Sequence, residues 1–373
     1  MNTPLEIRAW KLRLPLTSPY RLSFGPVSAF ETVFIQIDLP EGQRGLGEAT
    51  FLTGYTDEVF EESWSFLEQW ITRQQTLEQF NRALTQLADS RPFLTSALRS
   101  ALDMAACLPV LRSDRELRVP VLGLLQGNNK DQLEQNLRSL LQQGYRTLKL
   151  KVGFEPTRDG QFVNDVAALC KSMPQAAGLQ SELRLRVDAN QGFSSDQAIG
   201  FLKELRPASV SMIELFEQPC LARDWAAHAR VVPYAKDSGI QLMLDESIFG
   251  EADIQRAGEL QLASFIKVKL MKFEGLEALM RAIALIKQLG MTPVLGNGVA
   301  SDLNCWMEGC VAALCIENAG EMNGYLKQRK SPLIEPLAFA DGHLCAAAGW
   351  RPVLNMDALD ALQEGQIRVS IEH

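Results

Sequence analysis

Histidine is scarce in this 373-residue chain, which has only three, His228, His343 and His373. Because histidine is the usual general base of enzymes, any acid–base chemistry here must rely largely on other side chains. The seven cysteines show no CxxC spacing, which argues against a zinc or redox motif. We therefore expect buried, reduced thiols in a cytoplasmic protein.

Positive charge and long apolar runs are also missing. Lysine and arginine number 37 against 45 aspartates and glutamates, and the net charge of −8 without a basic run argues against a nucleic-acid partner. No apolar stretch approaches the ~18 residues of a membrane span. The first residues, "MNTPLEIRAWKLRLPL", carry scattered charges, unlike a signal or transit peptide. We expect a soluble protein without a membrane partner.

Hydrophobic residues make up 46% of the chain, enough for a large core. Residues 1–50 contain short strand-like runs such as "FETVFIQIDL" and "LGEAT", separated by turns, and residues 57–112 have helical periodicity. This pattern predicts an α+β unit over residues 1–115.

Residues 116–330 alternate strand-like and helical segments, which predicts parallel pairing and an α/β fold. The first strand-like run is "VPVLGLL", residues 119–125. The polar residues that end later runs follow one another at intervals of 24 to 29 residues: Asp188, Glu217, Asp245, Lys269 and Asn297. Such a repeat favours a modified TIM-type (β/α) barrel. Residues 331–373 return to short strands and are expected to pack back on the N-terminal unit.

Three carboxylates end successive strands of the predicted barrel. Asp188, Glu217 and Asp245 should meet at the mouth formed by the carboxyl ends of the strands, where active sites of this fold lie. Hard oxygen ligands without neighbouring histidine or cysteine suit Mg²⁺, or Mn²⁺, rather than zinc. Alternatively, each carboxylate caps the helix that follows it. Three carboxylates in register favour the metal site.

Two strands each carry a pair of lysines two residues apart, so that each pair shares one strand face. They are Lys149 with Lys151, and Lys267 with Lys269. A lysine base needs its pKa lowered from about 10.4 toward ~7–8, and a nearby ammonium group or divalent cation acts in that direction. One lysine would remove the α-proton of a metal-bound carboxylate substrate, and a second on the opposite face would return a proton. Structural ion pairs with the acids are the alternative.

The ordered set of motifs "KLKVG", "VDANQ", "FEQP", "LDES" and "KVKLMK", after a "GLGEA" strand, resembles the enolase superfamily, in particular its muconate-lactonizing-enzyme subgroup. The resemblance covers nearly the whole chain. It implies that residues 1–115 form a capping domain, on which residues 331–373 pack back, and it implies a small carboxylate substrate and, in many members, a homo-oligomer. The mandelate racemase branch uses a histidine–aspartate pair as its second base, and no histidine lies between His228 and His343 here.

The resemblance also assigns roles to single residues. Asp188, Glu217 and Asp245 would be the Mg²⁺ ligands, and Lys151 and Lys269 the two acid–base lysines. Lys149 would tune Lys151. The supporting residues, which share these motifs, would be Asn190, Glu246 and Lys267.

Members of the subgroup include muconate cycloisomerases, o-succinylbenzoate synthases, N-acylamino acid racemases and dipeptide epimerases. The epimerases usually hold a substrate ammonium with an Asp-x-Asp after the eighth strand, where this chain has Glu321 and Asn323 in "AGEMNGYL". One carboxylate is thus kept and one is an amide. Further candidates for substrate contact come from a strand end and from the two capping loops, "SPYRLSFG" and "FLTGYTDE": Asn297, Tyr20, Arg21, Thr53 and Tyr55.

We predict a racemase or epimerase of an amino-acid derivative that uses both lysines. A muconate-type cycloisomerase, an o-succinylbenzoate synthase or a dehydratase on the same scaffold would need only one of them. From other classes, a metal-free barrel with a Schiff-base lysine and a non-catalytic binding protein remain, and both leave the carboxylate trio without a use.

Overall fold

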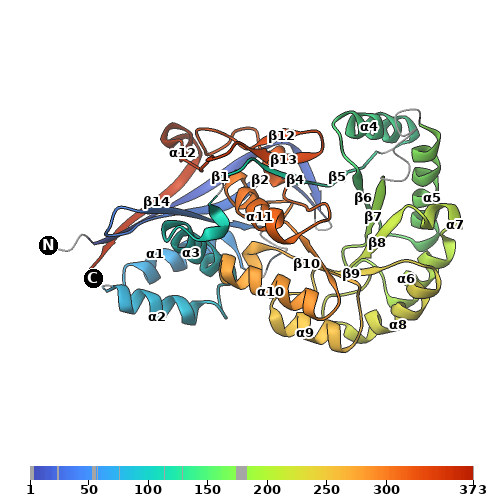
Figure 1. Cartoon of the computed structure of the whole chain (residues 1–373), viewed down its shortest axis with the longest axis horizontal. Coiled ribbons are helices and arrows are strands. Elements are labelled where there is room, and N and C mark those ends of the chain that lie inside the picture. The colour runs from blue at the N-terminus through green and yellow to red at the C-terminus, as the bar shows by residue number, and fades with distance from the viewer. Residues whose placement is uncertain are drawn as a thin grey trace.

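The computed structural model describes residues 4–22, 25–52, 56, 58–74, 76–112, 114–127, 129–173 and 183–372, with the backbone only at residues 21 and 22. Two parts can be distinguished (Figure 1). At one end, near both termini, a sheet of long strands packs on helices α1 to α3. At the other, a curved row of short strands is surrounded by helices. The predicted fold class, a modified (β/α) barrel with a capping unit, is confirmed.

The capping sheet is antiparallel throughout and contains strands from both ends of the chain. Its C-terminal strand is joined to the sheet by pairing with the N-terminal strand, from Leu5 opposite Ile371 onward. This confirms that the C-terminal segment packs back on the capping unit. In spatial order, the strands are β14 (Gln363–Ile371), β1 (Leu5–Leu22), β2 (Gly25–Asp38) and β3 (Arg44–Phe51).

The capping sheet is buried on both faces because its strands alternate between two cores. On β1, Ile7 and Ala9 belong to the core shared with the capping helices, whereas Trp10 and Leu12 belong to the larger core that continues into the barrel. This is the two-residue period of a strand with apolar side chains on each face. The helices that cover one face are α1 (Phe60–Ile71), α2 (Leu77–Leu87) and α3 (Pro92–Ala105).

Helix α3 lies against β3 without intervening side chains. A Cβ at Gly45 would be 1.8 Å from the carbonyl oxygen of Ala101, and a Cβ at Gly47 would be 1.8 Å from that of Ala97. Only glycine permits so close an approach of helix and strand backbones. The glycines of the "GLGEA" motif therefore fix the distance between the capping sheet and its helix.

The barrel consists of seven strands, each pair of neighbours parallel, in the order β11-β10-β9-β8-β7-β6-β5. Parallel strands joined by helices are the expected result of the alternating pattern. The strands are β5 (Gly123–Leu124), β6 (Thr147–Lys151), β7 (Arg184–Asp188), β8 (Ile213–Glu217), β9 (Leu242–Leu244), β10 (Phe265–Val268) and β11 (Thr292–Leu295).

The gap between the first and last barrel strands is bridged by backbone at Gly320 and Glu321. Glu321 N donates to Leu295 O of β11 at 2.9 Å, while Leu122 N, next to β5, donates to Gly320 O at 2.9 Å. Val121 and Gly320 also form a parallel bridge. This segment takes the place of an eighth strand, which brings Glu321 into the ring of strand ends.

The predicted first strand, "VPVLGLL", divides between two sheets. Its beginning belongs to β4 (Leu117–Pro120), which pairs with β13 (His343–Ala346) in a small sheet completed by β12 (Ala338–Ala340). Only the two residues of β5 join the barrel. Sequence periodicity cannot show this division, because it depends on a partner strand more than 200 residues away.

Helices follow the barrel strands and cover their outer side (Figure 1). None of the helices in the described ranges is long and apolar enough to cross a membrane. The predicted domain boundaries near residues 115 and 330 stay predictions. The helices after the capping unit are α4 (Lys130–Gln142), α5 (Pro156–Ser172), α6 (Ser195–Glu204), α7 (Pro207–Val210), α8 (Trp225–Asp237), α9 (Glu251–Glu259), α10 (Leu276–Gln288), α11 (Asp302–Cys315) and α12 (Met356–Leu362).

A buried carboxylate links the capping sheet to the barrel. Glu48 of β3 accepts hydrogen bonds from Ser301 N at 2.7 Å, from Ser301 Oγ at 2.5 Å and from Asn304 N at 3.1 Å, all at the beginning of α11. A helix N-terminus presents free N–H groups and favours negative charge. Glu48 thereby holds β3 over the loop that follows β11, close to the mouth of the barrel.

Candidate active site

The predicted metal ligands lie side by side at the carboxyl ends of the barrel strands. Lys151 on β6 pairs in register with Asp188 on β7, and Asp188 with Glu217 on β8. Asp245 directly follows β9, which lies between β8 and β10. The order of the motifs along the chain is thus also their order around the mouth. Their roles as ligands stay predictions.

The carboxylates do not cap the helices that follow them. Ser194 caps α6 and Asp224 caps α8 with their side chains, while α9 begins after Gly250 without a side-chain cap. The alternative interpretation of Asp188 and Asp245 as helix caps is therefore wrong.

Lys149 is the inner lysine of the first pair and is buried among carboxylates. Its Nζ lies 2.8 Å from Asp188 Oδ2, 2.9 Å from Glu217 Oε2 and 3.0 Å from Glu321 Oε2. Burial by itself would lower the pKa of Lys149, but these three carboxylates outweigh it and hold the pKa well above its ordinary value. Lys149 is consequently a fixed cation of the site.

Lys267, the inner lysine of the second pair, has the corresponding position at the other end of the row. Its Nζ lies 3.1 Å from Glu217 Oε1 and 3.4 Å from Asp245 Oδ2, and it also forms an ion pair with Glu321. Burial acts to lower the pKa of Lys267, yet Glu217 and Glu321 raise it above its ordinary value. The two inner lysines thus connect the acids into one continuous network.

The outer lysines, Lys151 and Lys269, are more exposed and each contacts one carboxylate. Lys151 Nζ is 2.6 Å from Asp188 Oδ2, and Lys269 Nζ is 2.7 Å from Asp245 Oδ1. Their side chains are 31% and 18% exposed, against 3% for each inner lysine. Access to the mouth is the property that a base needs in order to reach a substrate.

The pKa of Lys151 is raised in this arrangement, and the lowered pKa expected beside a divalent cation stays a prediction. Burial and the neighbouring Lys149 ammonium lower the pKa of Lys151, as expected, but the Asp188 carboxylate overcomes both and the pKa is raised. The sequence showed the like charge two residues away. It could not show that Asp188 would lie within hydrogen-bonding distance.

Asn190 and Glu246 support the Lys151 side of the site. Asn190 Oδ1 accepts from Lys151 Nζ at 2.5 Å, and Asn190 Nδ2 donates to Glu246 Oε1 at 3.0 Å. Asn190 has a φ of 41°, a left-handed conformation that asparagine tolerates better than most residues. Its backbone N–H also donates to Asp188 Oδ1 at 2.8 Å. The sharp turn after β7 therefore aims both Asp188 and Asn190 at Lys151.

Lys272 was not singled out from the sequence, although it is the third lysine of "KVKLMK". Its buried Nζ donates to the backbone oxygens of Asp245 at 3.0 Å and Ile248 at 2.9 Å, and lies 3.5 Å from Asp245 Oδ1. Burial and the neighbouring Lys269 lower the pKa of Lys272 to about 8. Lys272 fixes the loop that carries Asp245. Its position three residues after Lys269 was the available signal.

Glu308 of α11 is a second buried group that the sequence analysis missed. Its Oε1 accepts from Leu270 N at 2.8 Å and its Oε2 from Asn297 N at 3.1 Å, so it ties together the loops after β10 and β11. Burial raises its pKa to about 7. Asn297 turns its amide toward Met271 and its Oδ1 toward Val299 N. A substrate contact by Asn297 stays a prediction.

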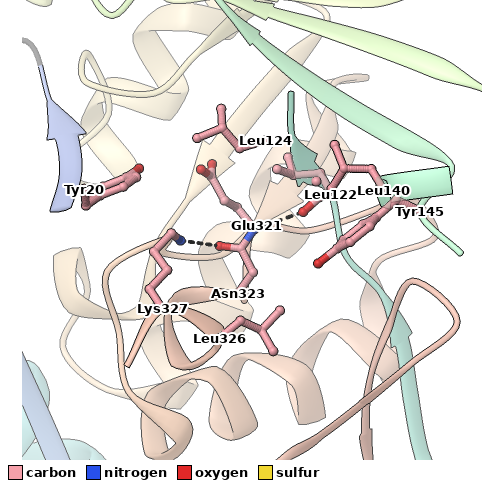
Figure 2. Close-up of a pocket in the computed structure, with 10 residues that line it drawn as sticks. Tyr20, Leu122, Leu124, Leu140, Tyr145, Glu321, Asn323, Leu326 and Lys327 are labelled. Carbon is pink, nitrogen blue, oxygen red and sulfur yellow. Dashed lines mark hydrogen bonds between the residues drawn. The ribbon is translucent and has the colours of Figure 1, made fainter. Parts of the chain in front are cut away.

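A cavity of about 160 Å³ is lined in part by Glu321 (Figure 2), the carboxylate that also pairs with Lys149 and Lys267. Glu321 and Asn323, both predicted for substrate binding, line it together with Lys327, which the sequence analysis missed. Lys327 Nζ donates to Asn323 Oδ1 at 2.9 Å, and Asn323 Nδ2 donates to Leu122 O at 3.0 Å. The apolar part of the lining comes from Tyr20, Leu122, Leu124, Leu140, Tyr145 and Leu326.

Tyr20, one of the predicted loop contacts, lines this cavity, and the Nζ of Lys327 lies 5.0 Å from its ring centroid. The other predicted loop contacts, Thr53 and Tyr55, lie outside the described residues, as does the side chain of Arg21. Their part in substrate binding therefore stays a prediction.

The donor set fits a hard divalent cation. Burial and the neighbouring Asp188 raise the pKa of Glu217 to about 7, so its negative charge is under-compensated even beside two lysines. Its Oε2 has Lys149 Nζ at 2.9 Å as an ion-pair partner but accepts no well-aligned hydrogen bond from the described residues. In the described part of the chain no three acidic, histidine or cysteine side chains enclose a metal ion, because Lys149 and Lys267 lie between the carboxylates. Carboxylate oxygens alone suit Mg²⁺.

Comparisons with known proteins agree with this geometry. An L-Ala-D/L-Glu epimerase from Clostridium acetobutylicum is 28% identical over 317 residues, 81% of this chain and 82% of that protein. The crystal structure of N-succinyl Arg/Lys racemase from Bacillus cereus matches with a TM-score of 0.82 at 22% identity, covering 98% of this chain and all of that one. A dipeptide epimerase structure from Cytophaga hutchinsonii, complexed with Mg and D-Ala-L-Val, matches over 98% of this chain and 100% of its own with a TM-score of 0.78 at 19% identity.

Residues 132–352, more than half of the chain, match the family described as enolase C-terminal domain-like. The match covers strands β6 to β11 and with them the predicted ligands and all six buried or half-buried lysines described above. The resemblance seen in the sequence motifs is thereby confirmed. The chain belongs to the enolase superfamily, within its mandelate racemase/muconate lactonizing enzyme group, and is an isomerase of that superfamily.

Proposed function

We propose that this enzyme is a Mg²⁺-dependent racemase or epimerase of an amino-acid derivative, of the N-acylamino acid or dipeptide type. Lys151 and Lys269 are its two acid–base residues. In the neutral form, one of them removes the α-proton of the substrate, and the other, as an ammonium group, donates a proton to the opposite face.

The observation that carries this proposal is the placement of Lys151 and Lys269 at the two ends of the carboxylate row. Lys151 ends β6 and Lys269 follows β10, with the carboxylate-bearing strands β7, β8 and β9 between them. Both are the more exposed members of their pairs. A reaction that inverts a carbon centre needs a proton acceptor on one face and a donor on the other, whereas a one-base reaction needs only one of them.

Asp188, Glu217 and Asp245 would hold the metal ion. When bound, Mg²⁺ supplies positive charge that stabilises the negative charge developing on the substrate carboxylate as the α-proton leaves. It would also compete with Lys151 and Lys269 for Asp188 and Asp245, since each outer lysine contacts one of these acids.

The relatives favour a substrate derived from an amino acid. They include the epimerase from Clostridium acetobutylicum and an N-succinyl-L-Arg/Lys racemase from Bacillus cereus, which is 23% identical over 317 residues. Their shared requirement is inversion at an α-carbon next to a carboxylate. The two outer lysines of this chain meet that requirement.

The deciding experiment is α-proton exchange in D₂O, followed by NMR with N-acylamino acids, dipeptides and cis,cis-muconate, with Mg²⁺ and with EDTA. We expect deuterium at the α-carbon and formation of the antipode with one amino-acid class, and loss of both with EDTA. Lactone formation from muconate without racemisation would show a cycloisomerase instead. Exchange that persists in EDTA would contradict the role of the metal.

A further inference from the structure

We propose that the capping unit positions one of the two proposed bases. Helix α3 fixes the backbone directly after Lys269, through the hydroxyl of Ser96 and through the side chain of Met271, so that Ser96 and Met271 are positioning residues for the proton transfer by Lys269. The inference rests on the proposed racemase function. It extends that function from the two bases to the residues that hold one of them.

The backbone after Lys269 is held by hydrogen bonds on both sides of Leu270. Leu270 N donates to Glu308 Oε1 of α11 at 2.8 Å, which fixes the peptide group between Lys269 and Leu270. Leu270 O accepts from Ser96 Oγ of α3 at 2.8 Å, which fixes the next peptide group. Ser96, Leu270 and Glu308 are all buried. Since a buried peptide group that loses its partner is costly, these two groups have one preferred orientation.

The side chains of the same segment belong to two different cores. Leu270 packs in the large core of the barrel, whereas Met271 packs in the core between the capping sheet and its helices. Every other buried member of the capping core in the described part of the chain lies within residues 5–101 or is Ile371. Because both cores are closely packed, the turn after Lys269 cannot shift without disturbing the capping unit.

The other proposed base is anchored differently. The backbone N–H groups of residues 153–155, just after Lys151, donate to Asp159 of the barrel helix α5. The Lys151 ammonium also has Asn190 as a partner besides its carboxylate, whereas the Lys269 ammonium contacts one carboxylate. Lys269 therefore depends more on its backbone for its position. Of the capping helices, α3 is the one that contacts this backbone, and it lies on the side facing the barrel (Figure 1).

Proton transfer is sensitive to such positioning. A displacement of about 1 Å by a change outside the reacting groups can cost about 10²-fold in rate. Loss of the Ser96 hydroxyl would leave Leu270 O without a partner and allow the turn that carries Lys269 to move. Each proposed base serves one face of the substrate, so the loss should fall on one enantiomer. A general loss of stability would instead affect both enantiomers alike.

The test compares Ser96→Ala with Ser100→Ala. Ser100 lies one turn further along α3 and is equally buried, but its hydroxyl has no hydrogen-bond partner in the described ranges. We follow α-proton exchange in D₂O for each enantiomer separately, and Lys269→Ala identifies the enantiomer that depends on Lys269. For that enantiomer, Ser96→Ala and Met271→Ala should lower kcat by at least about tenfold, with less than about a twofold change for the other. Ser100→Ala should change neither.

Equal loss for both enantiomers in Ser96→Ala would overturn the inference, and so would equal effects of Ser96→Ala and Ser100→Ala. Met271→Ala provides a second route to the same turn that does not depend on the serine hydroxyl.

A measurement without substrate separates this inference from the proposed function. Acetylation by acetic anhydride, followed by peptide-fragment mass spectrometry, compares the reactivity of the Lys269 and Lys151 amines. The ratio of the two should change at least about twofold in Ser96→Ala and Met271→Ala, because the surroundings of Lys269 change, and stay constant in Ser100→Ala. A constant ratio in all three variants overturns the inference. The expected change in ratio, together with no exchange by wild type on any compound, would support the positioning role and overturn the proposed function alone.

Discussion

The two lysine-bearing strands, β6 and β10, have the same pattern at opposite ends of the carboxylate row. In each, the first lysine is buried among three carboxylates, and the second is more exposed and contacts one. In each strand, two lysines on the same face thus have different environments because one lies deeper in the barrel than the other. The inner position, at Lys149 and Lys267, neutralises the acids, while the outer position, at Lys151 and Lys269, faces the mouth.

The two sides differ in what surrounds the outer lysine. Lys151 shares Asp188 with Lys149 and also contacts the Asn190 amide, whereas Lys269 shares Asp245 with Lys272, a further buried ammonium group. A neutral amide stabilises an ammonium group, and a neighbouring ammonium destabilises it. The two outer lysines therefore have different surroundings, with an additional amide beside Lys151 and an additional buried lysine beside Lys269.

The largest predicted effect comes from removing either outer lysine. Lys151→Ala and Lys269→Ala should each lower the racemisation rate by roughly 10²- to 10⁴-fold, because one proton-transfer step loses its catalyst. Each variant should still exchange the α-proton of one enantiomer, and the two variants should retain opposite enantiomers. NMR in D₂O with separate D and L substrates measures this. Loss of exchange with the same enantiomer in both variants would contradict the two-face arrangement.

The inner lysines should be the structural members of each pair. Lys149→Met or Lys267→Met leaves buried carboxylates without a counter-ion, and we expect the free energy of unfolding to fall by about 3–5 kcal/mol. Urea denaturation measures this loss, with Lys151→Met as the matched control on the more exposed position. An inner variant as stable as that control would show that the network contributes no stability.

Protonation of Glu308, on the Lys269 side, should make stability depend on pH. Burial raises its pKa to about 7, so the folded state binds this proton more tightly than the unfolded state. The stabilisation is complete below the unfolded pKa of about 4.5 and is lost as pH rises through about 7. From pH 5 to 8, Glu308→Gln should gain roughly 1–3 kcal/mol of unfolding free energy relative to wild type. A parallel pH dependence of the two proteins would be contrary evidence.

The smallest predicted effect is on the affinity for Mg²⁺, and it compares the proposed ligands at the two ends of the carboxylate row. Asp188→Asn and Asp245→Asn remove one anionic oxygen from opposite ends of the row and should each weaken Mg²⁺ binding by at least roughly tenfold. Asp159→Asn, near β6 but engaged with the backbone N–H groups of residues 153–155, serves as a control. Titration calorimetry measures the affinities. An unchanged affinity in either variant would remove that residue from the proposed ligand set.

The barrel and the order of its charged residues could be predicted from the sequence because both depend on local periods. Lys149 and Lys151 share a strand face whatever the rest of the chain does, and the spacing of Asp188, Glu217 and Asp245 follows the β/α repeat. The family resemblance added the assignment of Lys151 and Lys269. The division of "VPVLGLL" between two sheets depends on β13, which no local pattern reveals.

Other parts of the site depend on contacts between distant segments. Glu308 lies on a helix and Lys327 on a short helical turn, and neither element has a distinctive composition. Their roles can be recognised only when their partners are known, which lie in the loops after β10 and β11 and in the segment that takes the place of an eighth strand. The raised pKa of Lys151 has the same origin, since it reflects the distance to Asp188 rather than the spacing from Lys149. The sequence neighbour Lys149 alone would lower the pKa of Lys151.

The pairing of β1 with β14 has a consequence for biosynthesis. Leu5 of β1 lies opposite Ile371 of β14, so β1 is synthesised more than 360 residues before the strand with which it pairs. Domains generally begin to fold from the N-terminal side during synthesis, and contacts so distant in sequence form slowly. We expect the barrel strands to associate while the capping sheet still lacks its edge strand. Assembly of the catalytic mouth would then precede completion of the capping sheet, and a ribosome stalled before residue 363 would carry a barrel whose capping sheet lacks β14.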